Sequence, residues 1–382
     1  MTSTDMLCRR NATLADLVDL LKQQQVTKLD AVVPAAAITS VAGALHITGL
    51  GGEPVLTADG VTTAPGVFAP TAVCDTGLAD KLGIPGAYLR RMREQQPALL
   101  DANLNTWLAD APQRRFLIRT LRGQAGGQGI ARAFLSDSYR IVDNLDVLLA
   151  ALAGIKASGA ATQIVGCDLT ERRMYVLVQS ADIAVHAPTL LAGYRSPFTG
   201  ASGADNPLVF AGFVISNSET GNGSFSITPR ITVQVCSNGM TISRDAIREI
   251  HLGGRLEEGV IRWSTTTQQT ALDLVTRKAT DAVTTFLDHA YVNRTLTAIQ
   301  EQAAIRIHDV PATIEHVSKE LRFTADQQQT ILDHFIDAGD RTAGGILHAV
   351  TSTAQTQQDA DDAHTLERHA LRALTLAATH QR

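Results

Sequence analysis

The sequence predicts an α+β protein with a central, largely antiparallel sheet flanked by helices, followed by an all-α C-terminal region. Three observations support this class. Short apolar stretches alternate with glycine and proline up to about residue 263, the dipeptide Asn238–Gly239 is typical of a tight hairpin, and helical patterns follow one another from residue 265. We expect an N-terminal helical segment (1–40), an α+β core with a mixed or antiparallel sheet (41–263) and a helical C-terminal region (264–382).

The first part of the chain alternates helices and strands. Thr13 and Asp143 precede apolar residues at helical spacing, so both are predicted helix N-caps. The expected elements are, in order, a helix (13–25), hairpins (41–68), helices interrupted at Gly83, Pro85 and Pro97 (75–109), two strands (114–123 and 129–136) and a short helix (143–153).

The second part begins with sequence patterns typical of β-strands and ends with patterns typical of helices. A hairpin over 162–185 is expected to turn at 170–172, and longer strands are expected over 207–219 and 224–242. A helix over 267–307 carries apolar residues that we expect to pack on the sheet, with part of the stripe at a subunit contact. The polar stretch 351–363 reads as a loop or exposed linker.

Composition excludes several classes of protein. The 382 residues carry a formal net charge of −5, which rules out coating of nucleic acid by bulk positive charge but not a local basic patch. The four cysteines lie far apart, which predicts neither a disulfide framework nor a zinc site. No apolar stretch is long enough for a membrane span, and no leader pattern follows the N-terminus. We therefore expect a soluble intracellular protein with no membrane contact.

Motifs for catalysis, metals and cofactors are weak. The loop 123–129 is rich in glycine but lacks the Lys-Ser/Thr of a phosphate-binding motif, and residues 200–203 lack the spacing of a nucleophile elbow. His364 and His369 are five residues apart, which does not place them on one helical face as a zinc pair. We predict no catalytic residue, no metal, no cofactor and no enzymatic activity.

Arginine clusters point instead to nucleic acid. Three arginines lie on one predicted helix, and others lie on the two strands over 114–136, where alternate residues share a face. Such a face can follow a phosphate backbone while an aromatic side chain stacks on bases. The alternative is that these arginines pair internally with Asp137, Asp143 and Asp146. The predicted nucleic-acid-binding residues are Arg90, Arg91, Arg93, Arg115, Arg119, Arg132, Tyr139 and Arg140.

The polar loop 216–224 is a second candidate site. Its short polar side chains and glycines suit either a rigid turn or a loop that binds an anion. We expect it to lie beside the arginine-bearing sheet face and to be more mobile than the turn over 235–240. The candidate anion or ligand residues are Asn217, Ser218, Thr220 and Asn222.

Several stretches of the chain resemble a known family. The stretches are LGIPGAYLRRM (82–92), NLNTWLADAPQRRFLIRTLRG (103–123), RAFLSDSYRIVDNLDVL (132–148), SNSETGNGSFSITPRITVQVCSNGM (216–240) and, less specifically, DRTAGGILHAVTSTA (340–354). Together they resemble the phage/plasmid-like proteins known as domain of unknown function 932. The resemblance implies a mobile-element protein in the cytoplasm of the bacterial host cell, and it carries no list of catalytic residues.

Two functional hypotheses of different class follow. The first is a phage- or plasmid-encoded single-stranded DNA-binding protein of the recombination or strand-annealing kind, whose strand and helix order over 205–307 is compatible by analogy. The alternative is a mobile-element interaction protein, either an anti-defence factor or a phage-particle accessory protein, that binds a protein partner. An enzyme ranks third. We expect a homo-oligomer.

Overall fold

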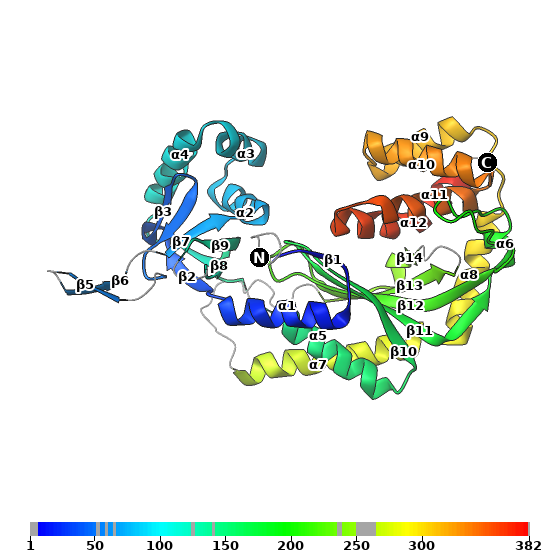
Figure 1. Cartoon of the computed structure of the whole chain (residues 1–382), viewed down its shortest axis with the longest axis horizontal. Helices are drawn as coiled ribbons and strands as arrows, with labels where there is room; N and C mark the ends of the chain where they lie inside the picture. Colours follow the sequence, from blue (N-terminus) through cyan, green and yellow to red (C-terminus); the bar gives the residue numbers. More distant parts are fainter. Residues whose placement is uncertain are drawn as a thin grey trace.

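The computed structural model describes residues 7–50, 54–57, 60–63, 66–123, 127–139, 142–234, 239–249 and 265–380. It confirms the predicted α+β class, because helices flank an antiparallel sheet and a mixed sheet, and the described chain from residue 265 onward is helical. Figure 1 shows two lobes, each built on one of these sheets.

The first lobe contains a six-stranded mixed sheet and a separate hairpin. Its strands are β2 (Ala31–Pro34), β3 (Ile38–Val41), β4 (Ala44–Ile47), β5 (Pro54–Thr57), β6 (Gly60–Thr63), β7 (Gly66–Pro70), β8 (Arg115–Leu121) and β9 (Gly129–Ser136). The sheet order is β2-β8-β9-β7-β4-β3, with β7 and β9 parallel and the other neighbours antiparallel. The hairpin β5–β6 extends away from the sheet (Figure 1).

Three helices complete this lobe, namely α2 (Ala72–Leu82), α3 (Gly86–Gln95) and α4 (Pro97–Asp110). They are interrupted where predicted. Gly83 ends α2 with a φ of 70°, a left-handed conformation that suits glycine, and Pro97 begins α4. The Thr71 hydroxyl caps α2 by accepting the Cys74 amide at 3.1 Å. The core of the lobe includes Phe68, Leu78, Leu104, Phe116 and Phe134.

The second lobe contains a seven-stranded antiparallel sheet. Its strands are β1 (Arg9–Ala12), β10 (Thr162–Leu169), β11 (Met174–His186), β12 (Leu208–Asn217), β13 (Phe225–Val233), β14 (Gly239–Thr241) and β15 (Ile247–Glu249). The order is β1-β10-β11-β12-β13-β14, and β15 also pairs with β13. The β10–β11 hairpin turns at residues 170–173, close to the predicted turn. Residues 235–238 of the predicted Asn-Gly turn lie outside the described residues.

Three helices pack on one face of this sheet: α1 (Leu14–Thr27), α5 (Asn144–Ser158) and α7 (Thr265–Phe286) (Figure 1). Thr13 caps α1 as predicted. Asp143 is the N-cap of α5, but its side chain makes no capping hydrogen bond, because it is used in ion pairs described below. Gly154 allows α5 and α7 to approach closely, since a Cβ there would collide with the backbone oxygen of Thr276.

The remaining helices cover the other end of the sheet: α6 (Pro188–Leu191), α8 (His289–Ala303), α9 (Val310–Leu321), α10 (Ala325–Ala338), α11 (Ala343–Thr356) and α12 (Ala360–His380). The prediction of one helix over 267–307 is wrong, because α7 ends at Phe286 and Asp288 caps α8. Its apolar stripe packs on the sheet as predicted. The prediction of a loop over 351–363 is also wrong, because α11 runs to Thr356.

The hydrophobic cores join segments that lie far apart in the sequence. One core belongs to the sheet of the first lobe. Helix α1 instead joins the core formed by the second sheet with α5 and α7, far along the chain. A third core joins the far end of that sheet to the C-terminal helices. None of the helices in the described ranges is both long and apolar enough to span a bilayer.

Candidate functional site

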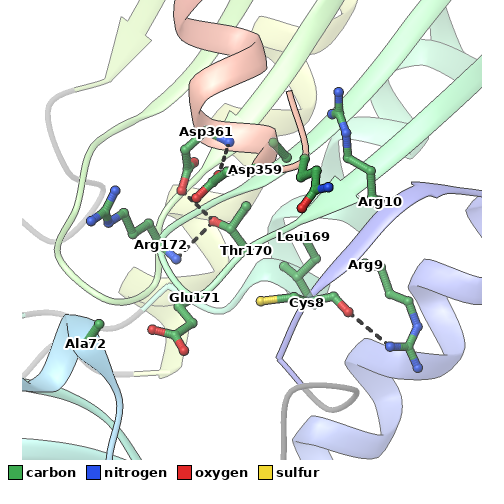
Figure 2. A pocket seen from close by; sticks show the side chains of 12 residues that line it. Cys8, Arg9, Arg10, Ala72, Leu169, Thr170, Glu171, Arg172, Asp359 and Asp361 are labelled. Atoms are coloured by element: carbon green, nitrogen blue, oxygen red, sulfur yellow. Dashed lines mark hydrogen bonds between the residues drawn. The ribbon is translucent and has the colours of Figure 1, made fainter. Parts of the chain in front are cut away.

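A cavity of about 500 Å³ lies where the two lobes meet (Figure 2). Four segments distant in sequence form its wall: residues 8–10 at the start of β1, the β10–β11 turn, the first residue of α2 and the start of α12. Its volume falls in the range of small-molecule and nucleotide sites. The cavity is therefore the first candidate for a ligand site.

Three arginines are among the residues that line this cavity. Arg9 and Arg10 come from β1, and Arg172 comes from the β10–β11 turn, where its side chain is exposed. Arg10 donates to Asp168 Oδ2 at 2.7 Å, yet 29% of its side chain stays exposed. Arg9 donates to the carbonyl oxygen of Cys8 at 3.0 Å. Guanidinium groups bind phosphate and carboxylate oxygens in a planar, bidentate manner.

Three carboxylates also line the cavity, and each has partners within the protein. Asp361 accepts from the Tyr175 hydroxyl at 2.7 Å and from the Thr170 hydroxyl at 2.9 Å. Asp359 accepts from the backbone amide of Asp361 at 2.7 Å and so caps α12. Burial raises the pKa of Glu171, although hydrogen bonding by the backbone amides of Val73 and Ala72 acts in the opposite direction.

A buried polar network is joined to the cavity wall through Arg10. Asp168 accepts from His364 Nε2 at 2.8 Å and from the Asn11 amide at 2.8 Å, in addition to its ion pair with Arg10. Burial acts to raise the pKa of Asp168, but His364, the Asn11 amide and Arg10 together hold it below its usual value. The His364 ring stacks on Tyr175 with centroids 3.9 Å apart. This network fixes α12 over β10 and β11.

The thiol of Cys8 lies at the edge of the cavity. Burial raises its pKa above the ordinary value, and the nearby carboxylates of Glu171, Asp359 and Asp361 raise it further. The thiolate is the nucleophilic form of cysteine, so this environment does not activate Cys8. The cavity therefore offers arginines, carboxylates and other polar groups for binding, without an activated nucleophile at this position.

Two of the predicted DNA-binding arginines lie elsewhere, in a buried ionic cluster between the lobes. Arg119 is fully buried, and its Nε donates to Asp30 Oδ2 at 3.0 Å while its Nη2 donates to Asp143 Oδ1 at 2.6 Å. Arg132 is 5% exposed and forms an ion pair with Glu219. A direct contact of these two guanidinium groups with DNA phosphates does not fit this burial. Of the predicted internal pairings, that with Asp143 is present.

The other predicted arginines are more exposed. Arg93 forms a bidentate ion pair with Asp75 and donates to the Gly43 carbonyl at 2.7 Å. Arg90 and Arg91 are exposed on α3, and Arg115 is exposed at the start of β8. The structure therefore separates the predicted set instead of bringing it together on one sheet face.

The structure describes only one of the last two predicted residues, Tyr139 and Arg140. Tyr139 is partly buried, its ring lies against Gly221, and burial raises its pKa. This packing leaves little of the ring for stacking on bases. Arg140 lies outside the described residues.

The loop 216–224 fills the space between the lobes. Its position beside the arginine-bearing sheet is confirmed, because Arg119 Nη1 donates to the Glu219 carbonyl at 2.6 Å. Residues 216–220 are buried, and the predicted ligand side chains bind protein groups. These bonds join Asn217 to Asn144, Ser218 to the Asn222 amide, Thr220 to the Glu171 carbonyl and the Asn222 side chain to Thr220. This accords with a rigid connection and not with an open anion-binding loop. The expectation that this loop is more mobile than the turn over 235–240 stays a prediction, because residues 235–238 lie outside the described part of the chain.

Sequence reasoning missed the cavity residues Arg9, Arg10 and Arg172. The pairs Arg9–Arg10 and Arg172–Arg173 were visible as adjacent arginines, but they lie about 160 residues apart, and β1 joins β10 only through long-range pairing. Within the described ranges, no group of three or more His, Cys, Asp or Glu side chains could hold a metal ion. No protein-family model, curated protein or solved structure matches the chain, so the resemblance to domain of unknown function 932 stays a prediction.

Proposed function

We propose that the protein binds single-stranded DNA and that one nucleotide of the strand occupies the cavity between the lobes. The observation that carries the proposal is that three arginines, Arg9, Arg10 and Arg172, are among the residues lining a cavity of nucleotide size. The cavity is lined by both lobes, because Ala72 belongs to the first lobe and the other lining segments belong to the second (Figure 2).

The distribution of hydrogen bonds favours an anionic ligand. Asp359 and Asp361 already accept hydrogen bonds from the protein, whereas Arg172 projects from a turn and is exposed. The first turn of α2 also enters the wall at Ala72, and the N-terminus of a helix favours a phosphate group. A phosphate placed between α2 and Arg172 would therefore meet hydrogen-bond donors from both lobes.

Further arginines flank this wall. Arg93 pairs with Asp75 in the first turn of α2, and the positive charge of Arg90 also acts on that carboxylate. Arg90 and the neighbouring Arg91 are exposed on α3. These side chains extend the positive charge from the cavity along the first lobe, where the next phosphates of a strand would lie.

The test is a binding measurement by fluorescence anisotropy with a labelled oligothymidylate of about 20 nucleotides. Arg172→Ala is expected to weaken binding about tenfold. It is also expected to make the slope of log binding constant against log salt concentration shallower by about 0.7, the value for one phosphate contact on a single strand. The matched control is Arg277→Ala, which removes an exposed arginine from α7 on the opposite side of the second sheet. Equal affinity of both variants and wild type would refute this site.

The resemblance to the phage/plasmid-like family supports a mobile-element origin and a place in the bacterial cytoplasm. Proteins that anneal single strands commonly assemble as rings or filaments, which is why we extend the proposal to a homo-oligomer. Light scattering over a range of concentrations tests this part separately. A monomeric mass throughout, with and without the oligonucleotide, would remove the oligomer while leaving the binding site intact.

A second candidate is the interaction protein, and one surface favours it. Leu99 and Trp107 lie about two turns apart on α4, and they expose 46% and 49% of their surface. Exposed tryptophan is common in protein interfaces. If Arg172→Ala leaves DNA binding unchanged and Trp107→Ala abolishes capture of a host or phage protein, the interaction hypothesis replaces the DNA-binding one.

A further inference from the structure

Three arginines are buried among the residues that the structure describes, and Arg132 differs from the other two. Arg119 and Arg230 each donate from Nε to a carboxylate oxygen, at 3.0 Å and 3.1 Å. Arg132 is 5% exposed and pairs with Glu219 through Nη1, but its Nε is buried without a hydrogen-bond partner among the described residues. A buried donor costs free energy unless an acceptor completes it, so this Nε indicates a binding site.

Two small cavities are lined by the ion pair of Arg132 with Glu219, and Gln24 of α1 lines both of them as well. Each cavity leaves about 10 Å³ for the centre of a water-sized molecule, which is about the least space that holds one water. Arg132 belongs to β9 of the first lobe, whereas Gln24 and the loop 216–224 belong to the second. The cavities therefore lie in the junction between the lobes.

The residues around this Nε provide acceptors for the hydrogens of a water molecule. The Glu219 carboxylate accepts from Arg132 Nη1 and from the Asn144 amide at 2.9 Å, and since a carboxylate has about four acceptor positions, it can accept more. Gln24 carries a second acceptor in its carboxamide. With Nε as donor to the water oxygen, these groups supply the roughly three hydrogen bonds that a buried water makes.

The charge of the junction favours an uncharged ligand over an anion. The ionic cluster consists of three cationic and three anionic side chains, namely Lys28, Arg119, Arg132, Asp30, Asp143 and Glu219. An anion in either cavity would lie near the carboxylate of Glu219, which lines both. Because the charges of the cluster balance, they do not offset this repulsion.

We propose that an ordered water molecule binds Arg132 Nε in the junction between the lobes and bridges it to Glu219 and Gln24. This site is independent of the proposed DNA-binding function. It makes the contact between the lobes partly water-mediated, because Arg132 reaches the second lobe through one direct ion pair and one water bridge.

A high-resolution crystal structure of the full chain tests the site. It is expected to show one water at about 2.7–3.2 Å from Arg132 Nε, the usual range for an N–H···O hydrogen bond. Two small cavities without an ordered water, or a protein acceptor on this Nε, would overturn the proposal. Crystals soaked in bromide distinguish water from an anion, since an anomalous peak within hydrogen-bond distance of Arg132 would identify a halide in its place.

Nuclear magnetic resonance tests the same site in solution on isotope-labelled wild-type protein. Magnetisation transfer from water to the Arg132 Nε–H group is expected in a rotating-frame spectrum, with the sign that separates a bound water from proton exchange. Arg230 is the matched control, because it is 6% exposed but donates from Nε to Glu367 at 3.1 Å. Equal transfer to the two groups, or transfer to neither, would show that no water is held at Arg132.

Discussion

Arg119 Nη2 and Asp143 Oδ1 lie 2.6 Å apart in a buried ion pair that joins the two lobes. Arg119 lies on β8 of the first lobe, and Asp143 precedes α5 of the second. Burial disfavours both charges, but Glu219, Asp30 and Asp143 raise the pKa of Arg119, and Arg119 with Lys28 lowers that of Asp143. Each charge in this cluster is therefore stable only while its partners remain.

Removal of Arg119 is expected to destabilise the fold strongly. In Arg119→Ala, the carboxylates of Asp30 and Asp143 lose a buried partner, and a loss of about 3–5 kcal/mol in the free energy of unfolding is typical of such a change. Urea unfolding monitored by circular dichroism measures this loss. Arg115→Ala on the same strand is the control, and because Arg115 is exposed it should change stability by less than about 0.5 kcal/mol. Similar values for the two variants would contradict the role of Arg119.

The site was harder to predict than the fold because its contacts are long-range. Alternation along β8 correctly places Arg115 and Arg119 on one face, but it cannot show that this face is exposed at Arg115 and covered at Arg119. The covering residue, Glu219, is 100 positions further along the chain. A local pattern reports the direction of a side chain and not what packs against it.

A second buried ion pair attaches α12 to the sheet. Arg230 of β13 donates from Nε and Nη2 to both carboxylate oxygens of Glu367, at 3.1 and 2.8 Å. Glu367→Leu is expected to cost about 3–5 kcal/mol, since it leaves Arg230 buried and unpaired. The double variant Arg230→Met/Glu367→Leu is expected to be more stable than Glu367→Leu alone. Denaturant unfolding of the two variants decides the point, and an additive further loss in the double variant would show that the pair is not coupled.

The helical region illustrates both what a sequence pattern predicts and where it fails. The helix cap at Thr13 and the breaks at Gly83 and Pro97 are local features, which is why element boundaries near them are predictable. Residues 351–354 look like a linker because they are polar, yet they are buried in α11. The Thr353 hydroxyl donates to the Ala349 carbonyl at 2.8 Å, so the preceding helical turn satisfies a polar group that composition alone assigns to solvent.

Stability is expected to fall under mildly acidic conditions because of His348. This residue is fully buried in α11, its Nε2 donates to the Leu190 carbonyl at 2.9 Å, and its Nδ1 has no partner. Burial lowers the pKa of His348 below its ordinary value near 6.5. The unfolded chain therefore binds a proton more readily than the folded one, and stability decreases as pH falls below about 6.5, by at most about 1.4 kcal/mol per pH unit.

His348→Gln isolates this contribution. Glutamine keeps a donor for Leu190 but does not titrate, so the urea midpoint of the variant should fall less between pH 7.5 and 5.5 than that of wild type. Burial also lowers the pKa values of His334 and His369, so these residues contribute to the pH dependence of both proteins. The contribution of His348 is therefore the difference between wild type and His348→Gln in how far the urea midpoint falls. An equal fall of the urea midpoint in the two proteins would show that His348 does not cause the loss of stability at acidic pH.

Alkylation of Cys8 reports on the cavity directly. Cys74 and Cys167 are buried, and burial raises the pKa of Cys167 to about 12, so neither should react in the folded protein. Cys8 is half-buried at the cavity edge with a raised pKa, so its reaction with iodoacetamide should be slow at pH 7.5 and accelerate toward pH 9. Cys236→Ser provides the background for measuring this rate by mass spectrometry, because it removes the one cysteine outside the described residues.

An oligonucleotide in the cavity should protect Cys8 from alkylation. The thiol lines the same cavity as Arg9 and Arg172, so a bound nucleotide limits access of the reagent, and its phosphate raises the pKa of the thiol further. The labelling rate of Cys236→Ser is therefore expected to fall severalfold when the oligothymidylate is added and to recover at a salt concentration that releases it. At an oligonucleotide concentration near the Kd of Cys236→Ser, the same addition should protect Cys8 of Cys236→Ser/Arg172→Ala much less, because the expected tenfold loss of affinity leaves most of that variant unbound. Equal protection of the two variants would place the nucleic acid elsewhere on the protein.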